Sequence, residues 1–253
     1  MAVGAFVRAG HGRRVAIRSL RGPRITIAYA ADEVVPAASL IKVPLAAAVW
    51  DAANDPSHHL DLTTLVACGE LGVTSYPSIM QVFSPDRMVS IAELVKIMLS
   101  TSDNPVSQYL LELVHPEAVN AAAARLGAKD TTMAVGFTDD LFGEAGRSNI
   151  TTANDMVNIF ASLFSNPSYQ PLLKAMRNNM RNTRIPLRLP DDLHVSHKTG
   201  SLTGLVNDAG IVYGTDIDLA MAFLADGQID GAATSTAIGD CVATIWSSVG
   251  ESI

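Results

Sequence analysis

One serine and one lysine interrupt the apolar segment AASLIKVPLAAAVW at residues 37–50. If SLIKVPLAAAVW, residues 39–50, is a helix, Ser39 and Lys42 lie one turn apart on the same face, so the lysine amine can reach the serine hydroxyl. A serine becomes nucleophilic when a base takes its proton, and a buried lysine with a lowered pKa can be that base. The alternative is a solvated lysine on an ordinary helix, because about one Ser-x-x-Lys pair is expected by chance in a chain of this length.

Two further motifs place polar side chains at predicted element boundaries. The stretch STSDNP contains Ser102 and Asn104, and SHKTGSLTG contains Lys198 and Thr199. An edge strand ending in Lys-Thr-Gly offers a cation for a carboxylate and an exposed amide donor. The alternatives are a helix N-cap for SDN, since Ser and Asp favour that position, and a solvated strand end for HKTG. Found together and in order, the three motifs predict an acyl-transfer site.

Strands near both ends of the chain, with helices between them, must position these motifs. RVAIRSL and RITIAYA flank the turn RGP and predict a β-hairpin. HVSHKTGSL, NDAGIVYG and DIDLAMAFLADG predict three more strands, and residues 231–248 predict a closing helix. Apolar residues at helical spacing predict helices at 91–99 and 156–164. The first and last parts of the chain would therefore form one α/β lobe with an all-helical lobe inserted.

Composition and charge exclude several classes of protein. The 253 residues carry a formal net charge of −7, which argues against a nucleic acid partner because phosphates would repel the chain. No apolar run has the length of a membrane span, so we expect no membrane partner. The start of the chain lacks the pattern of a signal peptide. We expect the chain as given to be cytoplasmic, or secreted or periplasmic if an export signal was trimmed.

The cysteines and histidines predict no metal site. Cys68 and Cys241 have neither the spacing of a zinc site nor the number of a disulfide framework, so we expect two free thiols. His194 and His197 would face opposite sides of a strand, so they cannot share an ion. We therefore expect no metal and no cofactor.

The Ser-x-x-Lys, SDN and KTG motifs together resemble those of the class A β-lactamase family of penicillin-recognising serine hydrolases. The resemblance runs from the hairpin before Ser39 to NDAGIVY. It implies an α/β (α+β) fold, in which an antiparallel five-stranded sheet is flanked by N- and C-terminal helices and carries an inserted all-α lobe. Residues 1–38 and 187–253 would form the α/β lobe and residues 39–186 the all-α lobe, with the active site at their interface.

The resemblance also implies that the enzyme opens a β-lactam or related amide through a covalent acyl-enzyme, with no cofactor. By similarity, Ser39 is the acylated nucleophile and Lys42 is its proton acceptor or relay. Ser102 would pass a proton to the leaving nitrogen, and Asn104 would hydrogen-bond both the substrate amide and Lys42. The partner implied is a small molecule, a β-lactam or another carbonyl compound with a carboxylate.

The KTG strand completes the site implied by the resemblance. Lys198 and Thr199 would bind the substrate carboxylate, and Gly200 would let the strand approach the substrate closely. The backbone N–H groups of Ser39 and Ser201 would form the oxyanion hole, two fixed donors aimed where negative charge develops on the attacked carbonyl.

The segment VGFTDDLFGEAGRSNITT departs from the family pattern. The family activates its deacylating water with a glutamate on this loop, and Thr138 falls at the expected place. Asp139 and Glu144 are near-equal stand-ins, and a surface or helix-capping acid is the alternative for each. Without a water-activating carboxylate a site retains its acyl group. Two other functions therefore stay open: a D,D-peptidase or esterase-like acyl transferase, and a sensor or binding protein that is acylated once.

Overall fold

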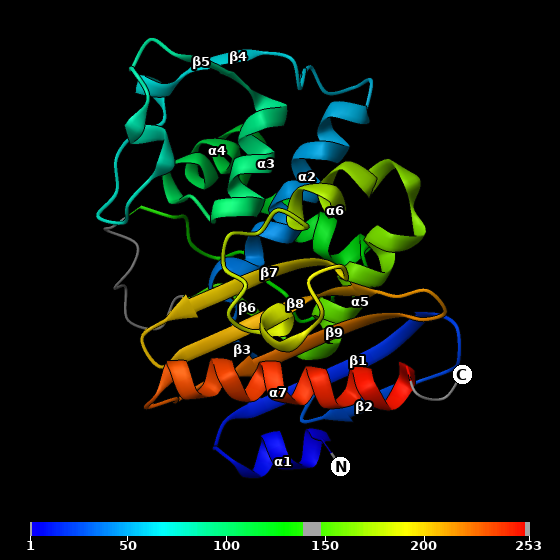
Figure 1. Ribbon diagram of the computed structural model, residues 1–253. Helices are drawn as coiled ribbons and strands as arrows, with labels where there is room; N and C mark the ends of the chain where they lie inside the picture. Colours follow the sequence, from blue (N-terminus) through cyan, green and yellow to red (C-terminus); the bar gives the residue numbers. More distant parts are fainter. Residues whose placement is uncertain (1, 139–147, 251–253) are drawn as a thin grey trace.

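A five-stranded antiparallel sheet forms the centre of the molecule, in the strand order β2-β1-β9-β8-β7 (Figure 1). The computed structural model describes residues 2–138 and 148–250. The strands are β1 (Arg13–Arg21), β2 (Thr26–Tyr29), β7 (His194–Leu202), β8 (Leu205–Tyr213) and β9 (Asp218–Ala225). The predicted hairpin and the three predicted C-terminal strands are therefore confirmed.

Helices cover both faces of this sheet. On one face, α1 (Ala2–Arg8) and α7 (Gly231–Gly250) pack against β1 and β9, where the Phe6 and Phe223 rings meet edge to face at 5.5 Å. On the other face lies α5 (Ala153–Ser165) (Figure 1). Because both faces are covered, β9 is buried along its whole length, which explains its continuous apolar sequence. The predicted flanking N- and C-terminal helices are confirmed.

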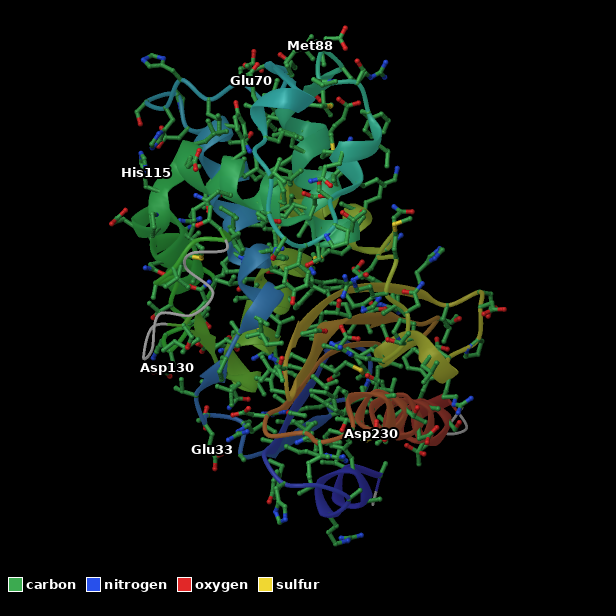
Figure 2. The ribbon with its side chains drawn as sticks, turned by 90° about the vertical axis from the view of Figure 1, so that its left-hand side faces the viewer. Glu33, Glu70, Met88, His115, Asp130 and Asp230 are labelled. Carbon is green, nitrogen blue, oxygen red and sulfur yellow. The ribbon has the colours of Figure 1, made fainter. Side chains whose placement is uncertain are left out.

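The remaining helices form a second cluster around one central helix. These helices are α2 (Lys42–Asn54), α3 (Ile91–Thr101), α4 (Asn104–Arg125) and α6 (Gln170–Met176). Every residue of α2 from Lys42 to Val49 is buried, which explains its apolar sequence on all sides. Pro44 lies in the first turn of α2, where the missing N–H removes no helical hydrogen bond. In Figure 2, Glu70 and Met88 mark the end of this cluster that lies farthest from α1.

The helix predicted over residues 39–50 differs from the structure in its first three residues. A 3₁₀ turn, η1 (Ala38–Ile41), contains Ser39, and the α-helix begins at Lys42. Ala38 has a positive φ of 46°, a conformation that an α-helix does not permit. Ser39 therefore lies in a tight turn immediately before α2, and not within it.

Short strands also occur outside the main sheet. They are β3 (Val35–Pro36) paired with β6 (Ile150–Thr151), and β4 (Leu65–Ala67) paired with β5 (Met88–Ser90). The sequence analysis did not predict them, because two or three residues carry too little periodicity. Helix α5 lies within the range predicted for the all-α lobe yet packs against the sheet. The division of the chain into lobes stays a prediction.

Two further expectations concern the cysteines and membrane-spanning segments. Cys68 and Cys241 are buried free thiols, as predicted. Within residues 2–138 and 148–250, no helix is both long and apolar enough to cross a membrane.

Candidate active site

A cleft of about 440 Å³ lies where η1, the turn between α3 and α4, and the edge strand β7 meet. Five of the predicted site residues line it, although they come from three distant parts of the sequence. They are Ser39, Ser102, Asn104, Thr199 and Ser201. Two more, Lys42 and Lys198, are buried next to these residues, at 0% and 1% exposure. The structure therefore brings the three motifs together, as the sequence predicts.

Buried Lys42 connects the first motif to the second. Its Nζ donates to the Ser102 carbonyl oxygen at 2.7 Å and to Asn104 Oδ1 at 2.6 Å, and it lies 3.4 Å from Ser102 Oγ. The predicted contact between Asn104 and Lys42 is thus confirmed. Burial, followed by the nearby charge of Lys198, holds the pKa of the Lys42 amine well below its usual range. Lys42 is therefore suited to be a neutral base.

The structure does not contain the predicted hydrogen bond between Lys42 and Ser39. The Lys42 amine is surrounded by three oxygens, which belong to Ser102 and Asn104. Within the described part of the chain, the Ser39 hydroxyl makes no hydrogen bond. Ser39 is therefore free to face a ligand in the cleft.

The SDN motif forms the turn between two helices. Ser102 ends α3 in the left-handed conformation, with φ 65° and ψ 30°, and Asp103 is the N-cap of α4. The Asp103 carboxylate accepts from the Val106 N–H at 3.1 Å and from Ser78 Oγ at 2.6 Å. The helix-cap interpretation is thus correct for Asp103. Because that cap fixes the turn, it also fixes the side chains of Ser102 and Asn104 on either side of it.

The KTG motif lies within the edge strand β7, and not at its end as predicted, because the strand continues to Leu202. Lys198 Nζ donates to the Thr199 carbonyl oxygen at 3.0 Å. Burial, followed by the charge of Arg181, lowers the pKa of Lys198 to about 7. Leu202 and Leu205 pair on either side of a two-residue turn. Backbone N–H groups along β7 point alternately toward β8 and away from it, so the Ser201 N–H faces the free edge of the sheet. That direction is the one required of an oxyanion donor.

Gly200 allows β7 to approach η1. A Cβ atom at this position would lie 2.8 Å from the Ala37 carbonyl oxygen and 3.3 Å from Ala38 Cβ. The glycine therefore permits contact with the backbone that carries Ser39, whereas the resemblance implied an approach to the substrate. The distance between the Ser39 and Ser201 N–H groups depends on this contact.

We expect Gly200→Ala to disturb that contact. The added methyl group would force β7 away from η1, which should lower the free energy of unfolding by about 1–3 kcal/mol and the acylation rate by roughly tenfold or more. Gly231→Ala is the matched control, because its Cβ would meet only Val206 Cγ2 at an ordinary 3.4 Å. Thermal unfolding and the rate of adduct formation measure the two effects. An unchanged acylation rate in Gly200→Ala would contradict this role.

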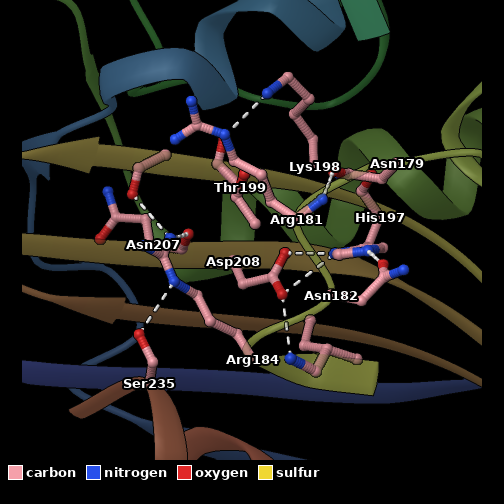
Figure 3. Close-up of polar contacts among 12 residues, drawn as sticks. Asn179, Arg181, Asn182, Arg184, His197, Lys198, Thr199, Asn207, Asp208 and Ser235 are labelled. Carbon is pink, nitrogen blue, oxygen red and sulfur yellow. Dashed lines mark hydrogen bonds and ion pairs between the residues drawn. The ribbon is translucent and has the colours of Figure 1, made fainter. Parts of the chain in front are cut away.

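A buried polar network supports β7 from the segment that follows α6 (Figure 3). His197 Nδ1 lies 2.9 Å from Asp208 Oδ1, and His197 Nε2 lies 3.0 Å from Asn182 Oδ1. Asn179 Nδ2 donates to the His197 carbonyl oxygen at 2.9 Å. Thr199 pairs with Asp208 across β7 and β8, so their side chains lie on the same face of the sheet. His197, two residues before Thr199, shares that face and points away from Lys198, as predicted.

Two arginines of the same segment reach the site, and sequence reasoning missed both. Arg181 lines the cleft, and buried Arg184 donates to the Gly200 carbonyl oxygen at 3.0 Å and to Ser201 Oγ at 2.6 Å. Neither belongs to a motif, and only the tertiary fold brings residues 177–184 against β7. No signal in the sequence identifies them.

Asp139 and Glu144 lie outside the residues that the structure describes. The centroid of the Phe137 ring lies 4.9 Å from Lys42 Nζ. The next residue, Thr138, is half-buried. Across residues 2–138 and 148–250, no carboxylate forms a hydrogen bond or ion pair with Lys42.

Comparisons with known proteins agree with this geometry. A model of the beta-lactamase enzyme family matches residues 4–249. A β-lactamase from Sphaerobacter thermophilus has a TM-score of 0.88 at 25% identity, covering 99% of this chain and 95% of that chain. A class A β-lactamase representative from Bacteroides cellulosilyticus has a TM-score of 0.81 at 25% identity, covering 95% and 92%. A β-lactamase from Chitinophaga pinensis, at 24% identity, shares the fold with a TM-score of 0.86, covering 98% and 97%.

No curated protein sequence matches the chain. The family match nevertheless covers nearly its whole length, and the structural similarity extends over the same range. The chain therefore belongs to the beta-lactamase enzyme family and is a serine hydrolase of the β-lactamase type.

Proposed function

We propose that the enzyme opens the amide ring of a β-lactam by forming an acyl-enzyme on Ser39. The observation that carries this proposal is the position of Lys42, fully buried and hydrogen-bonded to Ser102 and Asn104 beside the cleft that Ser39 lines. A buried amine with a lowered pKa, three residues after a serine that lines the cleft, supports nucleophilic catalysis by that serine.

In the proposed acylation, Lys198 and Thr199 hold the substrate carboxylate. The lactam carbonyl oxygen accepts from the backbone N–H groups of Ser39 and Ser201, which stabilise its developing negative charge. Lys42, as a neutral amine, takes the proton of the Ser39 hydroxyl while Oγ bonds to the carbonyl carbon. The tetrahedral intermediate then loses the lactam nitrogen, which receives a proton through Ser102.

In the proposed deacylation, water attacks the ester carbonyl and Ser39 leaves with a proton. This step needs a base that takes a proton from the attacking water as its oxygen bonds to the carbonyl carbon. Asp139 and Glu144 remain the two proposed candidates, and neither has support from the described residues.

Intact-protein mass spectrometry over time with benzylpenicillin tests the proposal, alongside the absorbance of the intact lactam. We expect one adduct per protein, transient, with the loss of many equivalents of drug. A persistent one-to-one adduct without turnover would limit the enzyme to acylation. A protein that forms no adduct and consumes no drug would overturn the proposed function.

The pKa of Lys198, lowered to about 7, predicts a pH dependence. Binding of the substrate carboxylate needs the ammonium form, which is present below about pH 7 and lost as the pH rises through that value. We therefore expect kcat/KM for acylation to decline above about pH 7, since kcat/KM reports groups of the free enzyme. In Lys198→Arg the decline should disappear, because guanidinium stays protonated.

The exposed Lys174 provides the control for this pH profile. Lys174→Arg removes a lysine without touching the cleft, so the profile should match that of the unaltered enzyme. An alkaline decline that persists unchanged in Lys198→Arg would assign the titration to another group.

A further inference from the structure

Arg181 is an exposed cation at the cleft. It lines the cleft together with Thr199 and Ser201. Its side chain forms no hydrogen bond or ion pair with any residue that the structure describes. A guanidinium group carries five donors, so Arg181 offers a complete donor face to a ligand.

The other cations around the cleft are already engaged. Arg184 donates to Gly200, Ser201 and Ser235, and Lys42 donates to Ser102 and Asn104. Lys198 makes one hydrogen bond, to Thr199, and is the proposed partner of the substrate carboxylate. Arg181 therefore adds a positive charge beyond the one that a single carboxylate needs.

Two buried acids near the cleft, among the residues that the structure describes, do not pair with Arg181. Asp208 accepts from His197 and from the Ile185 N–H, and Asp103 caps α4. Both carboxylates are buried, at 0% and 3% exposure, so neither can turn toward the cleft. Arg181 is the one charged residue among the described residues that line the cleft, in a chain whose net charge is −7.

Backbone contacts place Arg181 at one end of the substrate site. Its N–H donates to Asn179 Oδ1 at 2.9 Å, and Asn179 Nδ2 donates to the carbonyl oxygen of His197, the residue before Lys198 (Figure 3). Along β7, the proposed carboxylate site at Lys198 precedes the proposed oxyanion donor at Ser201. The main chain of Arg181 therefore lies beside the end of β7 that carries the proposed carboxylate site, which is the leaving-group side of the scissile amide.

Depth separates the two cationic positions. Lys198 and Thr199 are 1% and 3% exposed, whereas Arg181 is an exposed residue at the rim. One carboxylate bound at the buried pair leaves the Arg181 guanidinium in contact with whatever substituent extends outward from it.

We propose that Arg181 binds a second negatively charged group of the substrate, on the leaving-group side of the scissile amide, so that the enzyme prefers dianionic lactams to monoanionic ones. This inference rests on the proposed function, since it assigns Lys198 and Thr199 to the first carboxylate. Arg181 is a specificity-determining residue, and it takes no part in bond making or breaking.

The test uses two cephalosporins with the same thienylacetamido group. One carries a neutral 3-acetoxymethyl substituent and the other a 3-(carboxymethylthio)methyl substituent, so they have one and two carboxylates. Rates of adduct formation on the whole protein are measured by intact mass for the unaltered enzyme, Arg181→Gln and Arg181→Lys. Arg188→Gln is the matched control, because Arg188 pairs with Asp240 on the surface outside the cleft.

We expect Arg181→Gln to lower the acylation efficiency of the dianionic compound by roughly two- to fivefold, the range of a solvent-exposed ion pair. The effect should appear in KM, should shrink as salt is added, and should be partly restored in Arg181→Lys. The monoanionic compound and Arg188→Gln should change little.

Two results would overturn the inference while leaving the proposed function intact. Equal losses for both compounds in Arg181→Gln would show that Arg181 serves the single shared carboxylate. Equal rates in Arg181→Gln and the unaltered enzyme would show that Arg181 contacts neither. If the unaltered enzyme forms no adduct with either compound, the proposed function fails, and the inference fails with it.

Discussion

Replacing Ser39 with alanine is expected to abolish acylation and leave the protein folded. The Ser39 hydroxyl supplies the oxygen of the acyl bond, and alanine has no atom that can form this bond. We expect the rate of drug consumption to fall by about three orders of magnitude or more. Stability should change little, because the Ser39 side chain is half-buried and makes no hydrogen bond within the described residues.

Mass spectrometry and thermal unfolding together test this result. Ser57→Ala is the control, since Ser57 is exposed and its hydroxyl bonds only to nearby Asp55. That variant should form the adduct at the normal rate. An adduct retained in Ser39→Ala would place the nucleophile elsewhere, and Ser102 would be the next serine of the cleft to examine.

Lys42→Arg is expected to have the second largest effect, a loss of acylation comparable to that of Ser39→Ala. A guanidinium group does not release its proton at usable pH, so it cannot accept the proton of Ser39. The site is also closed around a lysine, because Lys42 is fully buried and three oxygens surround its amine. Raising the pH should not restore activity.

A second variant separates loss of the base from loss of the fold. Arginine is larger than lysine and places a permanent charge in a site with no carboxylate partner among the described residues, which is costly. In Lys42→Met the side chain has a similar length and no charge. We expect this variant to be folded, as a cooperative unfolding transition would show, and to be equally inactive. Normal acylation by folded Lys42→Met would exclude Lys42 as the base.

The sequence predicted the sheet correctly because its strands are long and strongly patterned. β7, β8 and β9 follow one another with short turns, so antiparallel pairing is the economical topology, and the structure has it. The short pairs β3–β6 and β4–β5 escaped prediction because local pattern does not determine long-range pairing. Local pattern also fails to predict η1, a 3₁₀ turn that begins with a positive φ at Ala38 and precedes the α-helix.

The sequence by itself determined the chemistry of this protein, because residue type fixes what a side chain can do. Serine with lysine, SDN and KTG predict acyl transfer, and the family match agrees. Only the tertiary structure decided which groups meet. It joined Lys42 to Ser102 and Asn104, and it brought Arg181 and Arg184 to β7. Burial and contacts between distant segments set charge, pKa and access, and a linear sequence does not contain those distances.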